Sequence, residues 1–369
     1  MRVIMTGGGT GGHIYPAIAI ADEIKKRNPD AKILFVGAER GLEKTLVPKR
    51  GYDIRLITVE GFDRKNLVRN VEVIRKLMKG NRQAAGIIKD FKPDFVVGTG
   101  GYASGPMVKA AQKAKIPTYV HEQNAYPGVT NKILEKGAKA VFLGFARAAE
   151  YFKDQDKLVV SGNPVRDEFR NKDREEARRA LGYDEDRFVV LAFGGSQGAG
   201  RINKAMVNVI KDLSGRDDIS IVLGAGSYYY DAIMESFSEE NFAPGDNIRI
   251  IEYIDDMASY LAAADLVISR SGALTVAETT VSGRPAIFIP SPMVTGNHQY
   301  YNALAVAEAG GAIIIEEKDL EDDKLTEQIL RLREDPDVLD RMAQASRRCG
   351  PDKATEIIVD RILEELKLG

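Results

Sequence analysis

The sequence predicts an α/β protein of two doubly wound, Rossmann-like domains, each built on a parallel β-sheet, facing a deep cleft. Two observations carry this prediction. Short runs rich in Val, Ile and Phe alternate with longer segments of helical periodicity along the 369 residues, and this alternation is typical of parallel sheets buried on both faces. In addition, both halves begin with a strand, a Gly-rich turn and a helix. A chain of this length accommodates two domains.

The first half contains five runs with strand character. They are RVIMT (2–6), KILFVG (32–37), DFVVGTG (94–100), PTYVHEQ (117–123) and LVVSG (158–162). The first run leads into a Gly-rich turn and a helix expected to start at Pro16. We place the end of this domain near Asn163-Pro164, where a Gly-Asn-Pro turn interrupts the pattern.

The second half repeats the arrangement. Its strands are expected at RFVVLAFGG (187–195), ISIVLGAG (219–226), IRIIEYI (248–254), DLVISRSG (265–272) and PAIFIPSP (285–292). The predicted domains are therefore 1–163 and 164–351. The pattern does not decide whether the last helix, about 352–366, stays with the second domain or packs back on the first.

Composition excludes several classes of protein. With 44% hydrophobic and 29% charged residues the chain has an ordinary globular composition, and its net charge of −2 gives no sign of a nucleic-acid partner. Cys349 is the single cysteine, which fits a reducing compartment. There is neither a secretory signal pattern nor a run of 18 apolar residues. We expect a protein that is soluble or lies on a membrane surface.

Three Gly-rich segments follow predicted strands, at 7–13, 98–105 and 194–199. Glycine lets the backbone approach a phosphate closely, and the helix that follows offers unpaired N–H groups. Tight packing of a strand against a helix explains each segment equally well on its own. Open parallel sheets bind ligands outside the carboxyl ends of their strands, which puts the expected ligand site at these turns.

The first segment also fits the dinucleotide pattern G-x-G-x-x-G. Gly7, Gly9 and Gly12 occupy its glycine positions, and Glu39 follows the second strand. An NAD enzyme is therefore an alternative. Against it, His13 follows the last glycine directly, and the other two Gly-rich segments would have no use.

Three polar segments follow other strands. His121-Glu122-Gln123-Asn124 ends the strand PTYV, and its alternative explanation is a polar loop with a buried, hydrogen-bonded histidine. The segment 271–278 opens a helix with small residues that leave backbone N–H groups for a diphosphate. Its Glu278 suits two ribose hydroxyls, or is an ordinary glutamate favoured by the helix dipole. The amides of 297–299 suit sugar hydroxyls.

Taken together, these motifs resemble the MurG family of inverting N-acetylglucosaminyltransferases, which have the GT-B fold. The matching segments occur in the family's order along nearly the whole chain: GGGTGGHIYPA, GTGGYASGP, HEQNAYPGVTNK, SGNPVR, GGSQGA, YIDDM, SRSGALTVAE and NHQYYNA. The resemblance implies transfer of N-acetylglucosamine (GlcNAc) from UDP-GlcNAc to the 4-hydroxyl of N-acetylmuramic acid (MurNAc) in lipid I. The partners it implies are UDP-GlcNAc, the undecaprenyl-linked lipid I and the membrane.

The resemblance also implies how the donor is bound, mainly on the second domain. Ser196 would contact the diphosphate, Arg166 and the backbone of Ile254 would hold the uracil, and Glu278 would bind the ribose. The implied backbone donors are Ala273, Leu274, Thr275, Val276 and Ala277. Gln299 and Asn124 would address the sugar.

The first domain would receive the acceptor. Thr10, Gly11 and Gly12 would close over the donor and bind the acceptor's diphosphate. The chain departs from some relatives at 125–127, between HEQN and GVTNK, which leaves the shape of that loop uncertain.

An inverting transfer needs one group to take a proton from the acceptor hydroxyl. We favour His13 as this base, because an unperturbed imidazole pKa of ~6.5 suits proton transfer near neutrality. The alternative role for His13 is that of a neutral hydrogen-bond donor to the acceptor phosphate. Glu122 is the second choice of base. Helix N-termini can stabilise the leaving diphosphate without a metal. The acidic pairs 184/186 and 154/156 look like solvated loops, so we expect no metal and no cofactor.

A basic segment suggests where the chain meets a membrane. Between Arg64 and Lys89 there are eight basic residues and one acidic residue, Glu72. Apolar residues recur at helical spacing beside them: Leu67, Val68, Val71, Ile74, Leu77 and Met78. This apolar stripe either packs on the first sheet or faces lipid. We predict peripheral binding to anionic lipid on the cytoplasmic face of the cell membrane.

Two other functions stay open at this point. Another UDP-sugar enzyme of the same fold, such as an epimerase, would share the nucleotide site without meeting a lipid. A binding subunit without catalysis would share it too, although both halves keep complete glycine segments.

Overall fold

The computed structural model describes residues 1–61, 69–321, 323–350 and 353–367. The chain forms two compact units. Unit 1 comprises Met1–Val165 together with Lys353–Gly369, and unit 2 comprises Arg166–Asp352. The division falls two residues after the boundary expected from the sequence, and the last helix belongs to unit 1.

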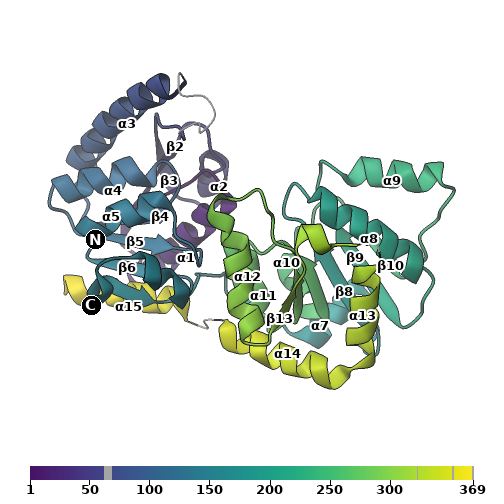
Figure 1. Cartoon of the computed structure of the whole chain (residues 1–369). Coiled ribbons are helices and arrows are strands. Elements are labelled where there is room, and N and C mark those ends of the chain that lie inside the picture. Colours follow the sequence, from purple (N-terminus) through teal and green to yellow (C-terminus); the bar gives the residue numbers. More distant parts are fainter. Residues whose placement is uncertain (62–68, 322, 351–352, 368–369) are drawn as a thin grey trace. The chain divides into compact units, whose positions relative to one another are not determined.

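Unit 1 is built on a sheet of seven parallel strands in the order β3-β2-β1-β4-β5-β6-β7 (Figure 1). The strands are β1 Arg2–Gly7, β2 Lys32–Ala38, β3 Asp53–Ile57, β4 Phe95–Gly100, β5 Thr118–Glu122, β6 Ala140–Leu143 and β7 Leu158–Val160. The strand order reverses between β1 and β4. The first two glycine segments follow these two strands, so both lie at the switch point where doubly wound folds bind ligands.

Helices cover both faces of this sheet. They are α1 Gly11–Arg27, α2 Glu43–Lys49, α3 Arg69–Phe91, α4 Ser104–Lys113, α5 Val129–Leu134 and α15 Ala354–Leu366, with short 3-10 turns η1 Glu135–Gly137, η2 Ala146–Tyr151 and η3 Gln155–Lys157. One core contains α1 together with Ile358, Val359 and Ile362 of α15, all three fully buried. The core on the other face contains residues of α3 and α4. The C-terminal helix is thus an integral part of unit 1.

Unit 2 repeats the plan with six parallel strands in the order β10-β9-β8-β11-β12-β13. They are β8 Phe188–Phe193, β9 Ile219–Gly224, β10 Ile248–Ile251, β11 Leu266–Ser269, β12 Ala286–Phe288 and β13 Ala312–Ile314. The order reverses between β8 and β11. The third glycine segment and the segment 271–278 follow these strands and therefore lie together at the second switch point.

Nine helices and two 3-10 turns are described for unit 2. They are α6 Glu168–Asn171, α7 Arg174–Leu181, α8 Gly200–Leu213, α9 Tyr230–Glu239, α10 Met257–Ala263, α11 Ala273–Val281, α12 His298–Glu308, α13 Lys324–Glu334 and α14 Pro336–Cys349, with η4 Thr295–Asn297 and η5 Glu317–Asp319.

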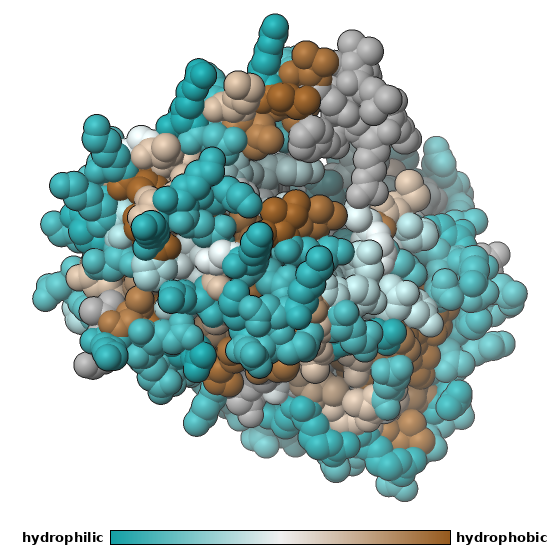
Figure 2. Space-filling view, turned by 60° about the vertical axis from the view of Figure 1, so that its left-hand side comes forward, coloured by the Kyte–Doolittle hydropathy of each residue, from teal (hydrophilic) through white to brown (hydrophobic). Residues whose placement is uncertain are grey.

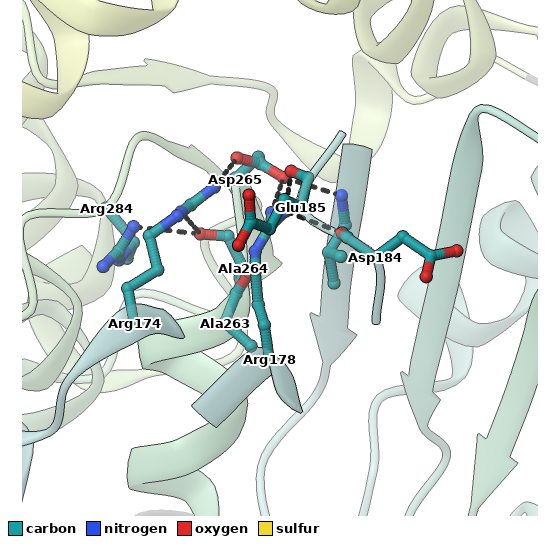
Figure 3. Close-up of polar contacts among 9 residues, drawn as sticks. Arg174, Arg178, Asp184, Glu185, Ala263, Ala264, Asp265 and Arg284 are labelled. Atoms are coloured by element: carbon teal, nitrogen blue, oxygen red, sulfur yellow. Dashed lines mark hydrogen bonds and ion pairs between the residues drawn. The ribbon is translucent and has the colours of Figure 1, made fainter. Parts of the chain in front are cut away.

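A cluster of charged side chains lies at the amino edge of this sheet and connects a helix to it (Figure 3). Asp265, which directly precedes β11, accepts hydrogen bonds from Arg174, from Arg178 and, at 2.8 Å, from the backbone N–H of Val189. Arg178 is buried, so its charge needs this partner. The cluster ties α7 to two strands at the edge opposite the switch-point loops.

The prediction of two parallel, doubly wound domains is confirmed. Every strand expected from the sequence is present; β3, β6 and β13 were not predicted. Helix α1 starts at Gly11 rather than at Pro16, because the carbonyl of Thr10 already accepts from the N–H groups of His13 and Ile14 at 3.2 and 3.3 Å. Pro16 then lies inside the helix and omits one backbone hydrogen bond. In the described parts of the chain, no helix is both long and apolar enough to cross a bilayer.

Candidate functional site

The first three glycines of the first glycine segment are required by packing and backbone conformation. A Cβ atom on Gly7 would lie 2.0 Å from the Thr99 hydroxyl oxygen, and one on Gly8 would lie 2.1 Å from a carboxylate oxygen of Glu43. Gly9 has φ +88°, a left-handed conformation that favours glycine. These positions need no ligand to explain them.

Gly11 and Gly12 differ from them. Among the described residues, a Cβ on Gly12 would meet the Thr10 hydroxyl at 3.5 Å, and one on Gly11 would meet the Tyr15 ring at 3.1 Å, apart from the backbone of the helix itself. Both residues open α1, a helix of 17 residues with no acidic side chain in its first turn, and the N-cap residue Thr10 makes no side-chain capping bond. The first N–H groups of a helix have no partner within it. This end of α1 is therefore suited to an anion.

The second glycine segment supports the first. Gly8 N–H donates to the carbonyl of Gly100 at 3.3 Å. A Cβ on Gly100 would lie 2.8 Å from the His13 ring, and one on Gly101 would lie 2.2 Å from the Gly8 carbonyl oxygen. Close approach of the two loops accounts for both glycines, so packing is sufficient here.

His13 is held by its neighbours in one orientation. Its Nδ1 lies 3.0 Å from the carbonyl oxygen of Gly8, and the Thr99 hydroxyl donates to the His13 carbonyl at 2.7 Å. Because a carbonyl only accepts, Nδ1 must carry the hydrogen. In the neutral ring the basic nitrogen is then Nε2, which is the form that a general base needs.

His121 is a buried, hydrogen-bonded histidine of the interior, which is one of the two explanations that the sequence left open. The side chain is fully buried, its Nε2–H donates to the Gly162 carbonyl at 3.1 Å, and Gln123 donates to its Nδ1 at 2.8 Å. Burial lowers the pKa of His121 to about 4. The ring is therefore neutral and part of the interior.

Glu122 is buried and uses both carboxylate oxygens within its own loop. Oε1 accepts from the backbone and side-chain N–H groups of Asn124 at 3.0 and 3.2 Å, and Oε2 accepts from Gly128 N–H and the Asn131 amide, each at 2.9 Å. These contacts fix the loop that presents Asn124, which is partly exposed.

At the switch point of unit 2, the third glycine segment is shaped by a neighbouring turn. A Cβ on Gly198 would lie 2.1 Å from the Ala225 carbonyl oxygen, and one on Gly194 would lie 2.3 Å from the Ala199 nitrogen. Gly195 has φ +95° with open space around it. Ser196 is exposed beside it, at the carboxyl end of β8.

The helix α11 presents a second open N-terminus. Its N-cap is Gly272, and its first turn contains no acidic residue. The N–H of Val276 donates to the Gly272 carbonyl at 2.9 Å. The first helical N–H groups, from Ala273 to Thr275, precede this bond and point out of the helix. These three are thus better placed to donate to a diphosphate than the N–H of Val276.

Glu278 and Arg166 lie within electrostatic range of one another. Burial raises the pKa of Glu278 to about 7, with Arg166 acting in the opposite direction and Glu168 adding to the rise. Arg166 also forms an ion pair with Glu168 at 2.6 Å. The residues that the resemblance assigns to ribose and to uracil are therefore neighbours.

Ile254 and Gln299 occupy other loops of the same sheet edge. Ile254 is buried, and its Cδ1 lies 2.8 Å from where a Cβ on Gly224 would be, which places it at the carboxyl end of β9. The side-chain oxygen of Gln299 accepts from the Ser291 N–H at 2.8 Å, and its backbone carbonyl accepts from the Ser271 hydroxyl at 2.8 Å. The amide nitrogen is the donor end of the Gln299 side chain.

The acidic pairs lie away from these loops. Asp184 precedes β8, at the amino edge, with 86% of its side chain exposed, and Asp154 pairs with Lys157 at 2.9 Å. Over residues 1–61, 69–321, 323–350 and 353–367, no three His, Cys, Asp or Glu side chains are grouped to hold a metal.

Helix α3 has two apolar faces. Val73, Ala84, Ile87 and Ile88 are buried in unit 1. Three residues of the predicted stripe are instead exposed: Val71 by 58%, Ile74 by 47% and Met78 by 54%. Leu77 is half-buried, whereas Leu67, Val68, Arg64 and Lys65 lie outside the described residues. The idea that the stripe packs on the sheet is therefore wrong for these three side chains.

Basic side chains accompany the exposed stripe. Arg75, Lys79, Arg82 and Lys89 are exposed on α3. Figure 2 shows exposed apolar atoms beside hydrophilic ones near the top of the view. Val129 and Ile133 of α5 are also exposed, by 62% and 56%. Unit 1 thus carries an apolar surface next to positive charge.

One residue of the site was not singled out from the sequence. Glu43, the first residue of α2, is 1% exposed and accepts from Gly9 N–H at 2.9 Å and from Ala38 N–H at 2.8 Å. Its only signal in the sequence is a glutamate at the start of a short helix, where such residues are common.

Two doubly wound units, each with loops suited to phosphate at the point where its strand order reverses, are the two domains of the GT-B fold. The N-terminal and C-terminal domain patterns of glycosyltransferase family 28 match residues 3–143 and 189–358. The chain belongs to this family, and within it to the MurG N-acetylglucosamine transferases.

The relatives are similar over their full length. A protein of Acetivibrio thermocellus, named UDP-N-acetylglucosamine–N-acetylmuramyl-(pentapeptide) pyrophosphoryl-undecaprenol N-acetylglucosamine transferase, is 47% identical, with 100% of this chain and 99% of the relative covered. A relative from Clostridioides difficile with the same name is 44% identical, with 99% and 89% covered. The crystal structure of Acinetobacter baumannii MurG superposes with a TM-score of 0.78 at 28% identity, covering 98% and 99% of the two chains.

More distant structures share the fold alone. The UDP-GlcNAc 2-epimerase of Neisseria meningitidis superposes with a TM-score of 0.70 at 17% identity, covering 99% of this chain and 100% of that one. Membership in glycosyltransferase family 28 confirms the predicted transferase. It argues against the two alternative enzymes, the epimerase and the NAD enzyme.

Proposed function

We propose that this protein transfers GlcNAc from UDP-GlcNAc to the 4-hydroxyl of MurNAc in lipid I, with inversion, and releases UDP and lipid II. The observation that carries the proposal is the loop set at the switch point of unit 2. There an open helix N-terminus lies on the same sheet edge as Ser196, with Glu278 and Arg166 paired electrostatically beside it. The names of the full-length relatives supply the substrates.

In this proposal unit 2 binds the donor. The N–H groups of Ala273 to Thr275 and the Ser196 hydroxyl bind the diphosphate, and the dipole of α11 stabilises the charge that builds up as UDP leaves. Glu278 accepts from the ribose hydroxyls, while Arg166 and the backbone of Ile254 bind the uracil. Gln299 addresses the sugar.

Unit 1 binds the acceptor and takes the proton. The N-terminus of α1, at Thr10, Gly11 and Gly12, binds the diphosphate of lipid I. The acceptor O4 attacks the anomeric carbon, the bond from that carbon to the diphosphate oxygen breaks, and Nε2 of His13 takes the hydroxyl proton. Glu122 serves to hold the loop of Asn124, because both its oxygens are occupied there.

The membrane part of the proposal rests on α3. The exposed Val71, Ile74 and Met78 enter the interface of the bilayer, and the neighbouring basic side chains attract anionic lipid on the cytoplasmic face. Peripheral binding of this kind would bring unit 1 to its lipid-linked acceptor.

One assay distinguishes this function from its rivals. The full chain is incubated with UDP-GlcNAc, with and without a lipid I analogue, and both UDP release and the disaccharide product are measured. UDP release that depends on the acceptor supports the transferase. A new UDP-sugar would instead indicate an epimerase, and no turnover under either condition would indicate a binding subunit; both results refute the proposal.

A further inference from the structure

A buried carboxylate is connected to His13 by a single peptide group. The peptide between Gly8 and Gly9 offers its N–H to Glu43 at 2.9 Å and its carbonyl oxygen to Nδ1–H of His13 at 3.0 Å. The carboxylate and the imidazole therefore bind opposite ends of the same amide.

The surroundings of Glu43 are built for its carboxylate. Its second oxygen accepts from Ala38 N–H at 2.8 Å. A Cβ atom on Gly8, Gly37 or Gly41 would come within 2.1 to 2.4 Å of the Glu43 side chain. These three glycines thus let the backbone come close to a side chain that is 1% exposed.

We propose that Glu43 positions the imidazole of His13 for proton transfer, acting through the Gly8–Gly9 peptide. A carboxylate that accepts from an amide N–H draws electron density toward the carbonyl end, because hydrogen bonds in a chain polarise one another. The carbonyl then becomes a better acceptor for Nδ1–H. This holds the ring in one orientation and keeps its lone pair on Nε2.

Glu43 is a positioning residue, since it does not touch the reacting atoms. The arrangement resembles a carboxylate that orients a histidine directly, except that an amide stands between the two groups. His121, which interacts electrostatically with His13, stays neutral because burial lowers its pKa to about 4. The inference rests on the proposed function, in which His13 is the base.

The test compares Glu43→Gln with a matched control. The N–H groups of Gly9 and Ala38 bind different oxygens of Glu43. Gln has an acceptor oxygen at only one of these two places, and it carries no charge. Glu135 provides the control: it is a buried carboxylate of unit 1 that accepts from the N–H groups of Lys153 and Asp154 at 2.6 and 2.7 Å, away from the glycine segments. Glu135→Gln removes the same charge and one acceptor.

Two readouts separate positioning from folding. We expect Glu43→Gln to lower kcat at least about tenfold with the KM values of donor and acceptor nearly unchanged, whereas Glu135→Gln changes kcat less than about twofold. Glu43→Asp, which keeps the charge, should recover part of the loss. UDP binding and thermal melting of each variant establish that the chain is folded.

Nitrogen-15 NMR shows directly which imidazole nitrogen of His13 carries the hydrogen. The chain has three histidines, and the spectrum of His13→Ala assigns the signal of His13. In the wild type Nδ1 should carry the hydrogen, and in Glu43→Gln a fraction of the Nε2–H tautomer should appear. An unchanged tautomer with unchanged kcat, or equal loss of kcat in Glu43→Gln and Glu135→Gln, would overturn the inference.

The failure of the proposed function would look different. Wild-type protein that makes no disaccharide would refute the transferase. A His13→Ala variant with near-normal kcat would refute the base. In both cases the tautomer measurement still decides whether Glu43 controls the ring.

Discussion

The carboxyl group of Glu278 offers a sharp test of the proposed donor site, because its pKa lies near neutrality. Burial raises that pKa from 4.5 to about 7, against the effect of Arg166. Ribose hydroxyls donate hydrogen bonds most strongly to an ionised carboxylate, which only accepts. UDP-GlcNAc should therefore bind the ionised form better, and its affinity should fall as the pH drops through 7.

The size of the effect follows from the competition of one proton with the ligand. With a pKa of about 7 for Glu278, about nine-tenths of the carboxyl groups are ionised at pH 8 and about one-tenth at pH 6. The dissociation constant of UDP-GlcNAc should thus rise about tenfold between pH 8 and pH 6. Calorimetric titration without acceptor measures it. UDP-GlcNAc is preferable to UDP, whose terminal phosphate titrates near pH 6.

Glu278→Gln is the matched variant, since its amide keeps the size but does not titrate. It should bind UDP-GlcNAc more weakly at pH 8 and lose the dependence on pH. A wild-type affinity that is constant from pH 6 to pH 8, or a slope that persists in Glu278→Gln, would refute the assignment of Glu278 to the ribose.

The free energy of unfolding of the protein without ligand should also depend on pH through Glu278, and the direction of this dependence follows from the pKa shift. The folded-state pKa of Glu278 lies above the unfolded value of 4.5, so its contribution is fully present below pH 4.5 and is lost as the pH rises through 7. Relative to the wild type, Glu278→Gln should therefore gain stability between pH 5 and pH 8. The gain is at most about 3 kcal/mol, because the partly exposed side chain keeps some hydration.

Three further outcomes are expected. His13→Ala should lower kcat at least ~10²-fold with little change in the donor KM, measured by UDP release under saturating acceptor; near-normal kcat would remove His13 from the role of base. Ile74→Ser should weaken binding to anionic vesicles about fivefold, as measured by co-sedimentation. Met234→Ser, a change at an exposed methionine of unit 2, should leave this binding unchanged. Equal binding of the wild type to neutral and anionic vesicles would contradict the role of charge. Excess chelator should leave full activity, and strict Mg²⁺ dependence would contradict stabilisation of the diphosphate by helix N-termini alone.

The sequence was sufficient for the architecture because buried parallel strands are continuous apolar runs. β1, β4, β8 and β11 are such runs, and they are the strands that set the two switch points. Two of the strands that escaped prediction lie at sheet edges and are only partly buried: β3 alternates exposed and half-buried residues, and β13 has one buried and two half-buried residues. β6 consists of four buried apolar residues and is as long as β11, so its length does not explain why it was missed.

The exposed stripe on α3 could not be decided from periodicity. Apolar residues lie on two faces of this helix, and a helical wheel does not say which face meets the sheet. Packing of Val73, Ala84 and Ile88 into unit 1 leaves Ile74 and Met78 outside. The choice is made by tertiary contacts, which a local pattern does not contain.

The glycine segments show the same limit at the level of single residues. From the sequence, all the glycines between Gly7 and Gly12 are equivalent signals of a phosphate loop. In the structure Gly7 and Gly8 are excluded from having side chains by Thr99 and Glu43, whereas Gly12 has space around its Cβ position. Absence of a side chain where one would fit is the observation that points to a ligand. The carboxylate of Glu43, which packs against Gly8, also accepts from Gly9 N–H, and the carbonyl of the same peptide lies at Nδ1 of His13. The packed end of the segment thus holds the peptide next to His13, and the open end is where we propose that the diphosphate of the acceptor binds.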